Sequence, residues 1–325
     1  MVRRSHFLRS LLALAASGLL SSTLLAADAW PSKPIRLVVP YPPGGSSDII
    51  ARSIGQLISQ ELKQTVVIDN KPGANGNLGA EFVARAPADG YTWLLCDLGA
   101  LAISPSTYTK LSFDPSKALR GAAMLAYSPH MLVVHPSVQA SNLKELVELS
   151  KKQDLNFAVT ASGSAPHLAG VELARITGAK WVYVPYKGGV QSVQDTVAGQ
   201  TQVLMNGMLA TYPHVQSGKL KLLGISKNTR MPLIADVPTL AEQGAQGFAS
   251  GTWQGVVLPA KTPEAVVQRV NQVLLAAIRS TEVRSRLTGQ GAEVVTMTPA
   301  ETDKFFNAER ARWRAVVQAA QLQLD

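Results

Sequence analysis

Apolar residues recur along the chain with two spacings, one typical of strands and one typical of helices. A β-rich run at Ile35–Val39 is followed by residues 48–63, whose apolar positions recur every three or four residues. Strands are also predicted at residues 65–68 and 91–95, with a helix at residues 78–86 between them. This βαβαβ order predicts an α/β fold in which helices cover both faces of a parallel sheet.

A second series of strands and helices follows the first. Its predicted strands are residues 131–135, 155–160, 181–184, 203–205, 220–225 and 254–258. Its predicted helices are residues 141–152, 166–177 and 190–198, and two C-terminal helices that begin near Pro263 and Pro299. Ser141 is a candidate N-cap, and Gly178 is placed to end a helix. No low-complexity linker separates the two series, so we expect ordered crossings between them.

One short pattern occurs in both series. Val39-Pro40-Tyr41-Pro42-Pro43-Gly44-Gly45 follows the first strand, and Val184-Pro185-Tyr186-Lys187-Gly188-Gly189 follows a strand of the second series. In an open α/β sheet, ligands bind at the carboxyl ends of the strands. Glycines let a ligand approach the backbone, and the N–H groups at a helix start favour anions. The two loops either close on an anion from both sides or are two ordinary strand-to-helix turns.

Two further segments carry candidate binding residues. Ser162-Gly163-Ser164-Ala165-Pro166-His167 follows a strand and opens a helix, and its hydroxyl and N–H groups suit a carboxylate. Helix capping accounts for one of these serines and less readily for the whole cluster. Asp97 follows the strand at residues 91–95. It is either a loop cap or a contact for an amine or hydroxyl of a ligand.

The N-terminus has the three parts of a secretory signal peptide. Arg3, Arg4 and Arg9 give a positive start, residues 11–25 are mostly apolar, and Ala27-Asp28-Ala29 precedes Trp30. The apolar stretch is short for a membrane span of about 20 residues. Residues 1–29 are therefore expected to direct export to the periplasm and to be removed near Ala29.

Composition narrows the classes of function. The chain has 325 residues, of which 46% are hydrophobic, so intrinsic disorder is excluded. A single cysteine excludes a disulfide framework. The net charge of +9 invites a nucleic-acid interpretation, but export and the scattered basic residues argue against it. Neither the histidine spacing nor the glycines at residues 73–79 match a metal or dinucleotide motif, so no metal and no cofactor are expected.

Several segments taken in order resemble one known family over nearly the whole mature chain. They are Trp30-Pro31-Ser32-Lys33-Pro34-Ile35, Val39-Pro40-Tyr41 with Gly44-Gly45, Asp48-Ile49-Ile50-Ala51-Arg52, Asn70-Lys71-Pro72-Gly73-Ala74-Asn75-Gly76-Asn77-Leu78-Gly79-Ala80, Ala88-Asp89-Gly90-Tyr91-Thr92, Pro185-Tyr186-Lys187-Gly188-Gly189, Asp236-Val237-Pro238-Thr239 and Pro259-Ala260-Lys261-Thr262-Pro263. The chain resembles the Bug family of periplasmic solute-binding proteins, the receptors of tripartite tricarboxylate transporters.

The resemblance implies a type II periplasmic-binding fold with two α/β lobes flanking a ligand cleft. One lobe would comprise residues 30–129 and 226–325, and the other residues 130–225. The family holds a carboxylate-bearing solute largely through backbone groups, hydroxyls and water. The ligand-binding positions it implies, together with the candidate Asp97, are Tyr41, Pro42, Gly44, Gly45, Ser46, Ser47, Asp48, Asp97, Ser162, Gly163, Ser164, His167, Tyr186, Gly188, Gly189 and Asn206.

The function expected from these observations is capture of a small organic carboxylate, with or without an amine or hydroxyl group. The receptor, expected to be a monomer without enzymatic activity, would then dock on a membrane permease. A sensor that presents its solute to a signalling receptor has the same features. An exported hydrolase that uses Cys96 or Ser162 as nucleophile and His167 as base is a different class, but no complete nucleophile, base and orienting group is recognisable.

The predicted signal peptide can be tested by mass. Because Ala27-Asp28-Ala29 precedes Trp30, protein isolated from the periplasm should begin at or near Trp30. Intact-mass spectrometry of the exported protein measures this directly. A mass that includes residues 1–29 would reject the signal-peptide interpretation.

Overall fold

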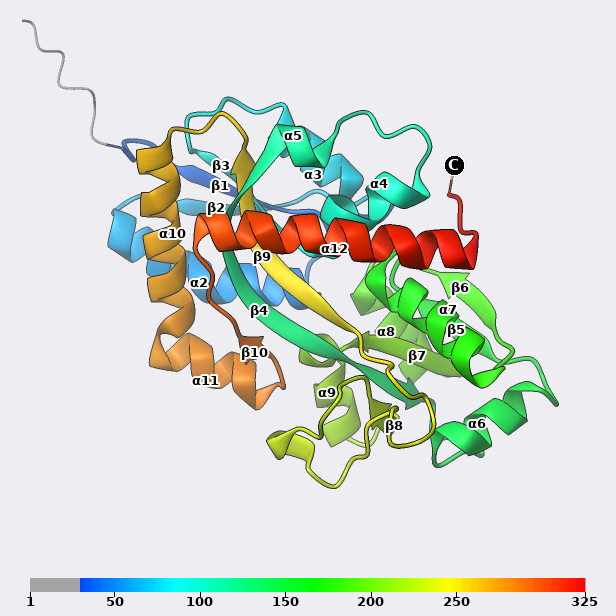
Figure 1. Ribbon diagram of the computed structural model, residues 1–325. Coiled ribbons are helices and arrows are strands. Elements are labelled where there is room, and N and C mark those ends of the chain that lie inside the picture. The colour runs from blue at the N-terminus through cyan, green and yellow to red at the C-terminus, as the bar shows by residue number, and fades with distance from the viewer. Residues whose placement is uncertain (1–29, 325) are drawn as a thin grey trace, which may run out of the picture. The chain divides into compact units, whose positions relative to one another are not determined.

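One long strand, β4 (Leu119–Val134), runs through the whole sheet of the computed structural model, which describes residues 30–324. The sheet has ten strands in the order β2-β1-β3-β9-β4-β7-β5-β6, with β8 and β10 also paired to β4 (Figure 1). The other strands are β1 (Ile35–Val39), β2 (Val66–Asn70), β3 (Thr92–Cys96), β5 (Asn156–Val159), β6 (Val182–Pro185), β7 (Val203–Gly207), β8 (Lys221–Ile225), β9 (Gly251–Pro259) and β10 (Glu293–Val294).

Two parallel sets of strands flank a central antiparallel pair. In the first set β1 pairs in parallel with both β2 and β3, and in the second β5 pairs in parallel with both β6 and β7. The central strands β4 and β9 are antiparallel, from Leu119 opposite Pro259 to Pro129 opposite Gly251. Strand β9 also pairs with β3, and β4 continues to pair with β7. The backbone hydrogen bonds of this pair therefore connect the two parallel sets.

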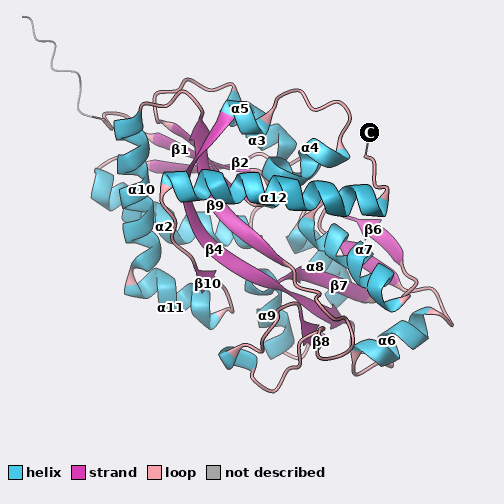
Figure 2. Ribbon diagram, in the orientation of Figure 1, coloured by secondary structure: helices cyan, strands magenta, loops and turns pink. Residues whose placement is uncertain are grey.

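Helices cover the sheet on both faces, as Figure 2 shows. They are α2 (Ser46–Leu62), α3 (Asn77–Ala84), α4 (Ser104–Thr107), α5 (Pro115–Ala118), α6 (Leu143–Ser150), α7 (Ala165–Thr177), α8 (Gly189–Val197), α9 (Met208–Gln216), α10 (Glu264–Arg279), α11 (Thr281–Gly289) and α12 (Pro299–Ala320), with short turns of other helix types at Ala74–Gly76, Gly99–Ile103 and Pro232–Ile234.

The last helix, α12, joins parts of the fold that are far apart in sequence. It lies across the central strands in Figure 1 and packs on β4, on the turn Gly99–Ile103 and on α7. It begins with a capping box, in which Thr298 and Glu301 satisfy each other's backbone N–H groups. Trp313 and Phe306 point inward and are 4% exposed. Burial of such side chains contributes roughly 1.5–3 kcal/mol each.

Each parallel set has its own hydrophobic core. The core of the first set includes Val38, Leu94 and Trp313, and the core of the second includes Leu132 and Phe157. The inner strands β1, β3, β5 and β7 are largely buried on both faces, which explains why they are apolar runs, whereas the edge strands β2 and β6 are partly exposed. No helix among residues 30–324 is both long and apolar enough to cross a membrane.

The structure confirms the two βα series and corrects their details. Strand β4 begins at Leu119 rather than at residue 131. The first half of the strand was missed because it is rich in alanine and is followed by Pro129, and neither residue is typical of a strand interior. Helices α9 and α11 were not predicted, and α9 contains Pro213. The N-cap of α6 is Asn142, whose side chain accepts from Glu145 N–H, rather than Ser141. The expected lobe boundary after residue 129 falls inside β4.

A glycine in α3 should control how this helix packs beside β1. A Cβ added at Gly79 would lie 2.7 Å from Pro40 Cβ and 3.0 Å from Pro40 Cα. Gly79→Ala should therefore lower the free energy of unfolding by about 1–3 kcal/mol, as other overpacked sites do. Urea unfolding followed by circular dichroism measures this loss. Gly289→Ala at the end of α11 is the matched control, since nothing lies within 4 Å of its added Cβ. Equal effects of the two substitutions would disprove the packing argument.

Candidate ligand-binding site

The loop between β1 and α2 is held in place by Asp48. Its Oδ2 accepts from Gly44 N–H at 2.9 Å and from Arg52 Nε at 2.8 Å, and its Oδ1 accepts from Asn70 Nδ2 at 3.0 Å. Burial opposes ionisation of Asp48, but these hydrogen bonds outweigh it and lower the pKa of the carboxyl. Asp48 therefore fixes the shape of the loop, and its direct contact with a ligand stays a prediction.

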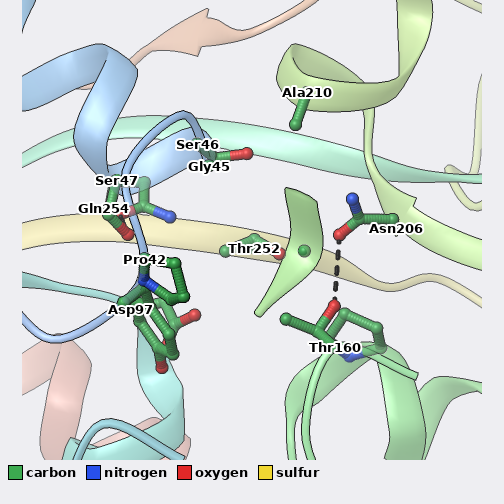
Figure 3. Close-up of a pocket in the computed structure, with 13 residues that line it drawn as sticks. Pro42, Gly45, Ser46, Ser47, Asp97, Thr160, Asn206, Ala210, Thr252 and Gln254 are labelled. Carbon is green, nitrogen blue, oxygen red and sulfur yellow. Dashed lines mark hydrogen bonds between the residues drawn. The ribbon is translucent and has the colours of Figure 1, made fainter. Parts of the chain in front are cut away.

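This loop forms one wall of a cavity between the two parallel sets of strands. The cavity volume open to a water-sized molecule is about 40 Å³, so a ligand larger than a few water molecules requires its walls to move apart. Figure 3 shows Ser46, Ser47, Gln254 and Asp97 on one side and Thr160 and Asn206 on the other. The lining residues are Tyr41, Pro42, Gly45, Ser46, Ser47, Asp97, Thr160, Pro166, Gly189, Asn206, Ala210, Thr252 and Gln254.

The first turns of four helices meet at this cavity. Ser46 begins α2, Pro166 follows the first residue of α7, Gly189 begins α8 and Ala210 is in the first turn of α9. The first N–H groups of a helix have no partner within the helix, and the helix dipole places partial positive charge there. Gly45, the N-cap of α2, makes no side-chain cap hydrogen bond. Pro166 has no N–H group, and Leu209 N–H of α9 donates to Ser128 Oγ, so the backbone donors that can bind an anion come chiefly from α2 and α8.

Asn206 adds a side-chain donor to this wall. The residue is 6% exposed, and its Oδ1 lies 3.4 Å from Thr160 Oγ1, which donates to it. Its Nδ2 is buried without a hydrogen-bond partner among the described residues. A buried donor without a partner costs about 1–3 kcal/mol. A ligand oxygen in the cavity would remove that cost.

The floor of the cavity comes from β9. Gln254 Oε1 accepts from Ser47 Oγ at 2.8 Å, so the amide group of Gln254 is oriented by the first turn of α2. Thr252 Oγ1 lies 2.9 Å from Nε2 of His130, whose Nδ1 is 3.0 Å from Ser250 Oγ. His130 itself is fully buried. The central strands thus place two polar side chains below the ligand space.

Asp97 is the only charged residue among the described residues that line the cavity. Its Oδ1 accepts from Tyr41 OH and from Gly99 N–H, both at 2.7 Å. Burial raises the pKa of Asp97, and the two hydrogen bonds only partly offset this effect. Burial beside the Asp97 carboxyl also raises the pKa of Tyr41 well above its usual value. Asp97 is therefore both a loop cap and a cavity residue.

Several contacts close the cleft around the cavity. A Cβ added at Gly188 would lie 2.6 Å from Pro42 Cδ, so only glycine allows this approach. Gly44 has a φ of +87°, and its added Cβ would lie 3.4 Å from Val190. Farther along the rim, Asn75 Nδ2 donates to Gly163 O at 3.0 Å. The two loops that share the Pro-Tyr pattern therefore meet each other, which favours the first of the two interpretations left open by the sequence.

The serine cluster before α7 lies beside the cavity and not on its lining. Ser164 is the N-cap of α7 and accepts from His167 N–H at 3.3 Å, while His167 Nδ1 accepts from Gly163 N–H at 3.0 Å. Ser162 and Tyr186 line an adjoining groove, which shares Tyr41 and Pro42 with the cavity. Direct binding by these residues stays a prediction.

Cys96 does not have the surroundings of a nucleophile. It is fully buried in the core of the first parallel set, and burial raises the pKa of its thiol well above the usual value. His167, the base considered for it, uses Nδ1 to accept from a backbone N–H. No group of three or more metal-binding side chains occurs among residues 30–324.

Sequence reasoning missed five lining residues, which are Thr160, Pro166, Ala210, Thr252 and Gln254. Pro166 belongs to the segment Ser162–His167 that had been singled out and Thr160 lies two residues before it, so that segment was the available signal. Ala210 belongs to α9, whose Pro213 hides it from a helical pattern. Thr252 and Gln254 point into the cavity only because β9 crosses below it.

The comparisons with known proteins agree with this geometry. The family model described as tripartite tricarboxylate transporter family receptor matches residues 50–322. The chain belongs to this family. Protein BugT of Bordetella pertussis is 33% identical to the receptor over 297 residues, which cover 90% of this chain and 91% of BugT.

Solved structures show the same fold. The periplasmic binding protein BugD has a TM-score of 0.86 and 30% identity, with 90% of this chain and 99% of that chain covered. The structure of R. palustris Rpa4515 with adipate has a TM-score of 0.87 and 30% identity, with the same coverage. These findings confirm the Bug-family resemblance and the two-lobed periplasmic-binding fold. The family consists of transport receptors, and the signal-peptide prediction lies outside the described residues.

Because two histidines of the receptor are buried, we expect its folded state to lose stability at acidic pH. Burial lowers the pKa of His130 to about 3 and that of His167 to about 4, whereas an unfolded histidine titrates near 6.5. The unfolded state therefore binds more protons in the window between these values. The free energy of unfolding should fall as the pH decreases through it, by up to about 1.4 kcal/mol per pH unit for each histidine.

We expect His167→Gln to reduce this loss of stability when urea unfolding is compared at about pH 5 and about pH 7.5. The measurement at the higher pH is the control, because both rings are largely neutral there in the folded and unfolded states. A difference at that pH reports lost packing alone. The same pH dependence in wild type and variant would contradict a buried neutral ring at His167.

Proposed function

We propose that the protein is an extracytoplasmic receptor that captures a small organic carboxylate and delivers it to the permease of a tripartite transporter. The observation that carries this proposal is the meeting of four helix N-termini around one cavity, together with the unpartnered Nδ2 of Asn206. Family membership supports the transport role. It also supports binding without chemical conversion, so we propose no enzymatic activity.

The carboxylate would be held by neutral donors. None of the described residues that line the cavity is Lys or Arg. A carboxylate accepts two or more hydrogen bonds, and N–H groups of a helix start and side-chain amides can supply them. The first turn of α2 at Ser46 and Ser47 and the amide of Asn206 face each other across the cavity (Figure 3). The adipate bound by Rpa4515 is a carboxylate as well.

Ligand capture would couple to movement of two lobes. We propose that one lobe comprises residues 30–129 and 226–325 and the other residues 130–225, and that both turn about β4 and β9, which pair across the whole sheet. The contacts between Pro42 and Gly188 and between Asn75 and Gly163 belong to the closed arrangement. Closure would bring donors from both lobes to one ligand. The closed receptor would then present a changed surface to the permease. We propose that it acts as a monomer in the periplasm.

The α2 wall can be tested at Gly45. This residue has a φ of −77° and a ψ of 172°, and the nearest atom to an added Cβ is Pro42 O at 3.9 Å. Gly45→Val should therefore fold, while its side chain fills space that the ligand needs next to the helix start. Calorimetry with a panel of small carboxylates should show affinity lowered by more than about tenfold, or about 1.4 kcal/mol.

Gly289→Val on the exposed end of α11 is the matched control and should bind like wild type. Circular dichroism of both variants checks that the fold is kept. Unchanged affinity in a folded Gly45→Val protein would remove the first turn of α2 from the binding site. Absence of binding by wild-type protein to every carboxylate in the panel would reject the proposed function.

A further inference from the structure

The cavity wall carries groups of opposite chemistry. The start of α2 and the amide of Asn206, on opposite sides, supply donors. Asp97 supplies an acceptor, beside Pro42 and across the pocket from Thr160 (Figure 3). A ligand that bears only carboxylates can bind the donors but also brings a like charge near Asp97.

Only one oxygen of Asp97 is used by the protein. Tyr41 OH and Gly99 N–H both donate to Oδ1, and no hydrogen bond to Oδ2 is formed by the described residues. This arrangement fixes the side chain and leaves Oδ2 available on the cavity side. A carboxylate accepts about four hydrogen bonds, so Asp97 retains capacity for a further donor.

No cation of the described residues neutralises Asp97. The groups that stabilise its ionised form are the Tyr41 hydroxyl and backbone N–H groups. No Lys or Arg lies among the described residues of the cavity wall. A carboxylate removed from water without a counter-charge is costly, and a positive group on the ligand would compensate it.

We propose that the ligand is zwitterionic, with its carboxylate at the start of α2 and the amide of Asn206 and a protonated amine on Asp97 Oδ2. This inference rests on the proposed function and names its substrate class as small amino acids. Both charged groups of such a ligand find a partner, since the carboxylate meets N–H donors and the amine meets the one acidic side chain among the described lining residues. A ligand hydroxyl at the same place would donate a weaker hydrogen bond, because it is neutral.

The test compares ligands that differ only in the amine. The pairs are aspartate and succinate, glutamate and glutarate, and leucine and 4-methylpentanoate, each measured by calorimetry with wild type, Asp97→Asn and Asp154→Asn. Asparagine keeps an oxygen that can accept from Tyr41 OH and Gly99 N–H, so Asp97→Asn should fold. Asp154 is exposed on the surface, and its substitution removes the same charge without touching the cavity.

We expect wild type to prefer the amine-bearing member of at least one pair by about tenfold or more. Asp97→Asn should lower the affinity for that amino acid by about tenfold to a hundredfold, which is the effect expected from loss of a hydrogen bond between charged groups. The same substitution should leave the affinity for the acid without an amine unchanged or raise it, because the negative charge of Asp97 that repels the ligand carboxylate has been removed. Asp154→Asn should behave as wild type.

Two results would overturn the inference and leave the proposed function standing. One is preference of wild type for the acids without an amine in all three pairs. The other is an equal effect of Asp97→Asn on both members of a pair, which would leave Asp97 as a loop cap. If wild type binds none of the six compounds nor any other small carboxylate, the proposed function and this inference fail together.

Discussion

The hydrogen bonding of β4 with β9 is the constraint on which the rest of the structure depends. The two antiparallel strands pair from Leu119 opposite Pro259 to Pro129 opposite Gly251, and each then pairs with a strand of a different parallel set. Backbone groups in a buried sheet must be paired, so the register of this pair determines how the two sets face each other. The cavity lies where the carboxyl ends of both sets point toward the same space.

The positions of the helix N-termini follow from this placement of the strands. In a parallel βα unit the helix begins just beyond the carboxyl end of its strand, so α2, α7 and α8 all begin at the cavity, and α9 begins there after β7. Their dipoles and free N–H groups replace the lysine or arginine that a carboxylate would otherwise require. A site built from neutral donors avoids the desolvation cost of a buried cation when the cleft is empty of ligand.

The loops of the site are set by glycine, proline and one ion pair. Asp48 holds the β1–α2 loop through a hydrogen bond from Gly44 N–H and an ion pair with Arg52. Pro42 packs so close to Gly188 that a side chain at residue 188 would clash with it. Asp97 stands apart from this pattern, because its burial is costly and its free oxygen faces the ligand space. Its presence is explained best by a positive group on the ligand.

Much of this protein was determined by local sequence. The βα series, the strand Ile35–Val39, the helix that Gly178 ends and the loops at Tyr41–Asp48 and Gly188–Gly189 could all be predicted, because burial periodicity and turn residues act over a few neighbours. The length of β4, the helix α9 and the lining residues Thr252 and Gln254 could not. Pro213 hides α9 from a helical pattern, whereas the length of β4 and the direction of Thr252 and Gln254 depend on pairing between segments more than a hundred residues apart. Only the tertiary structure decides which side chains such pairing brings to one cavity.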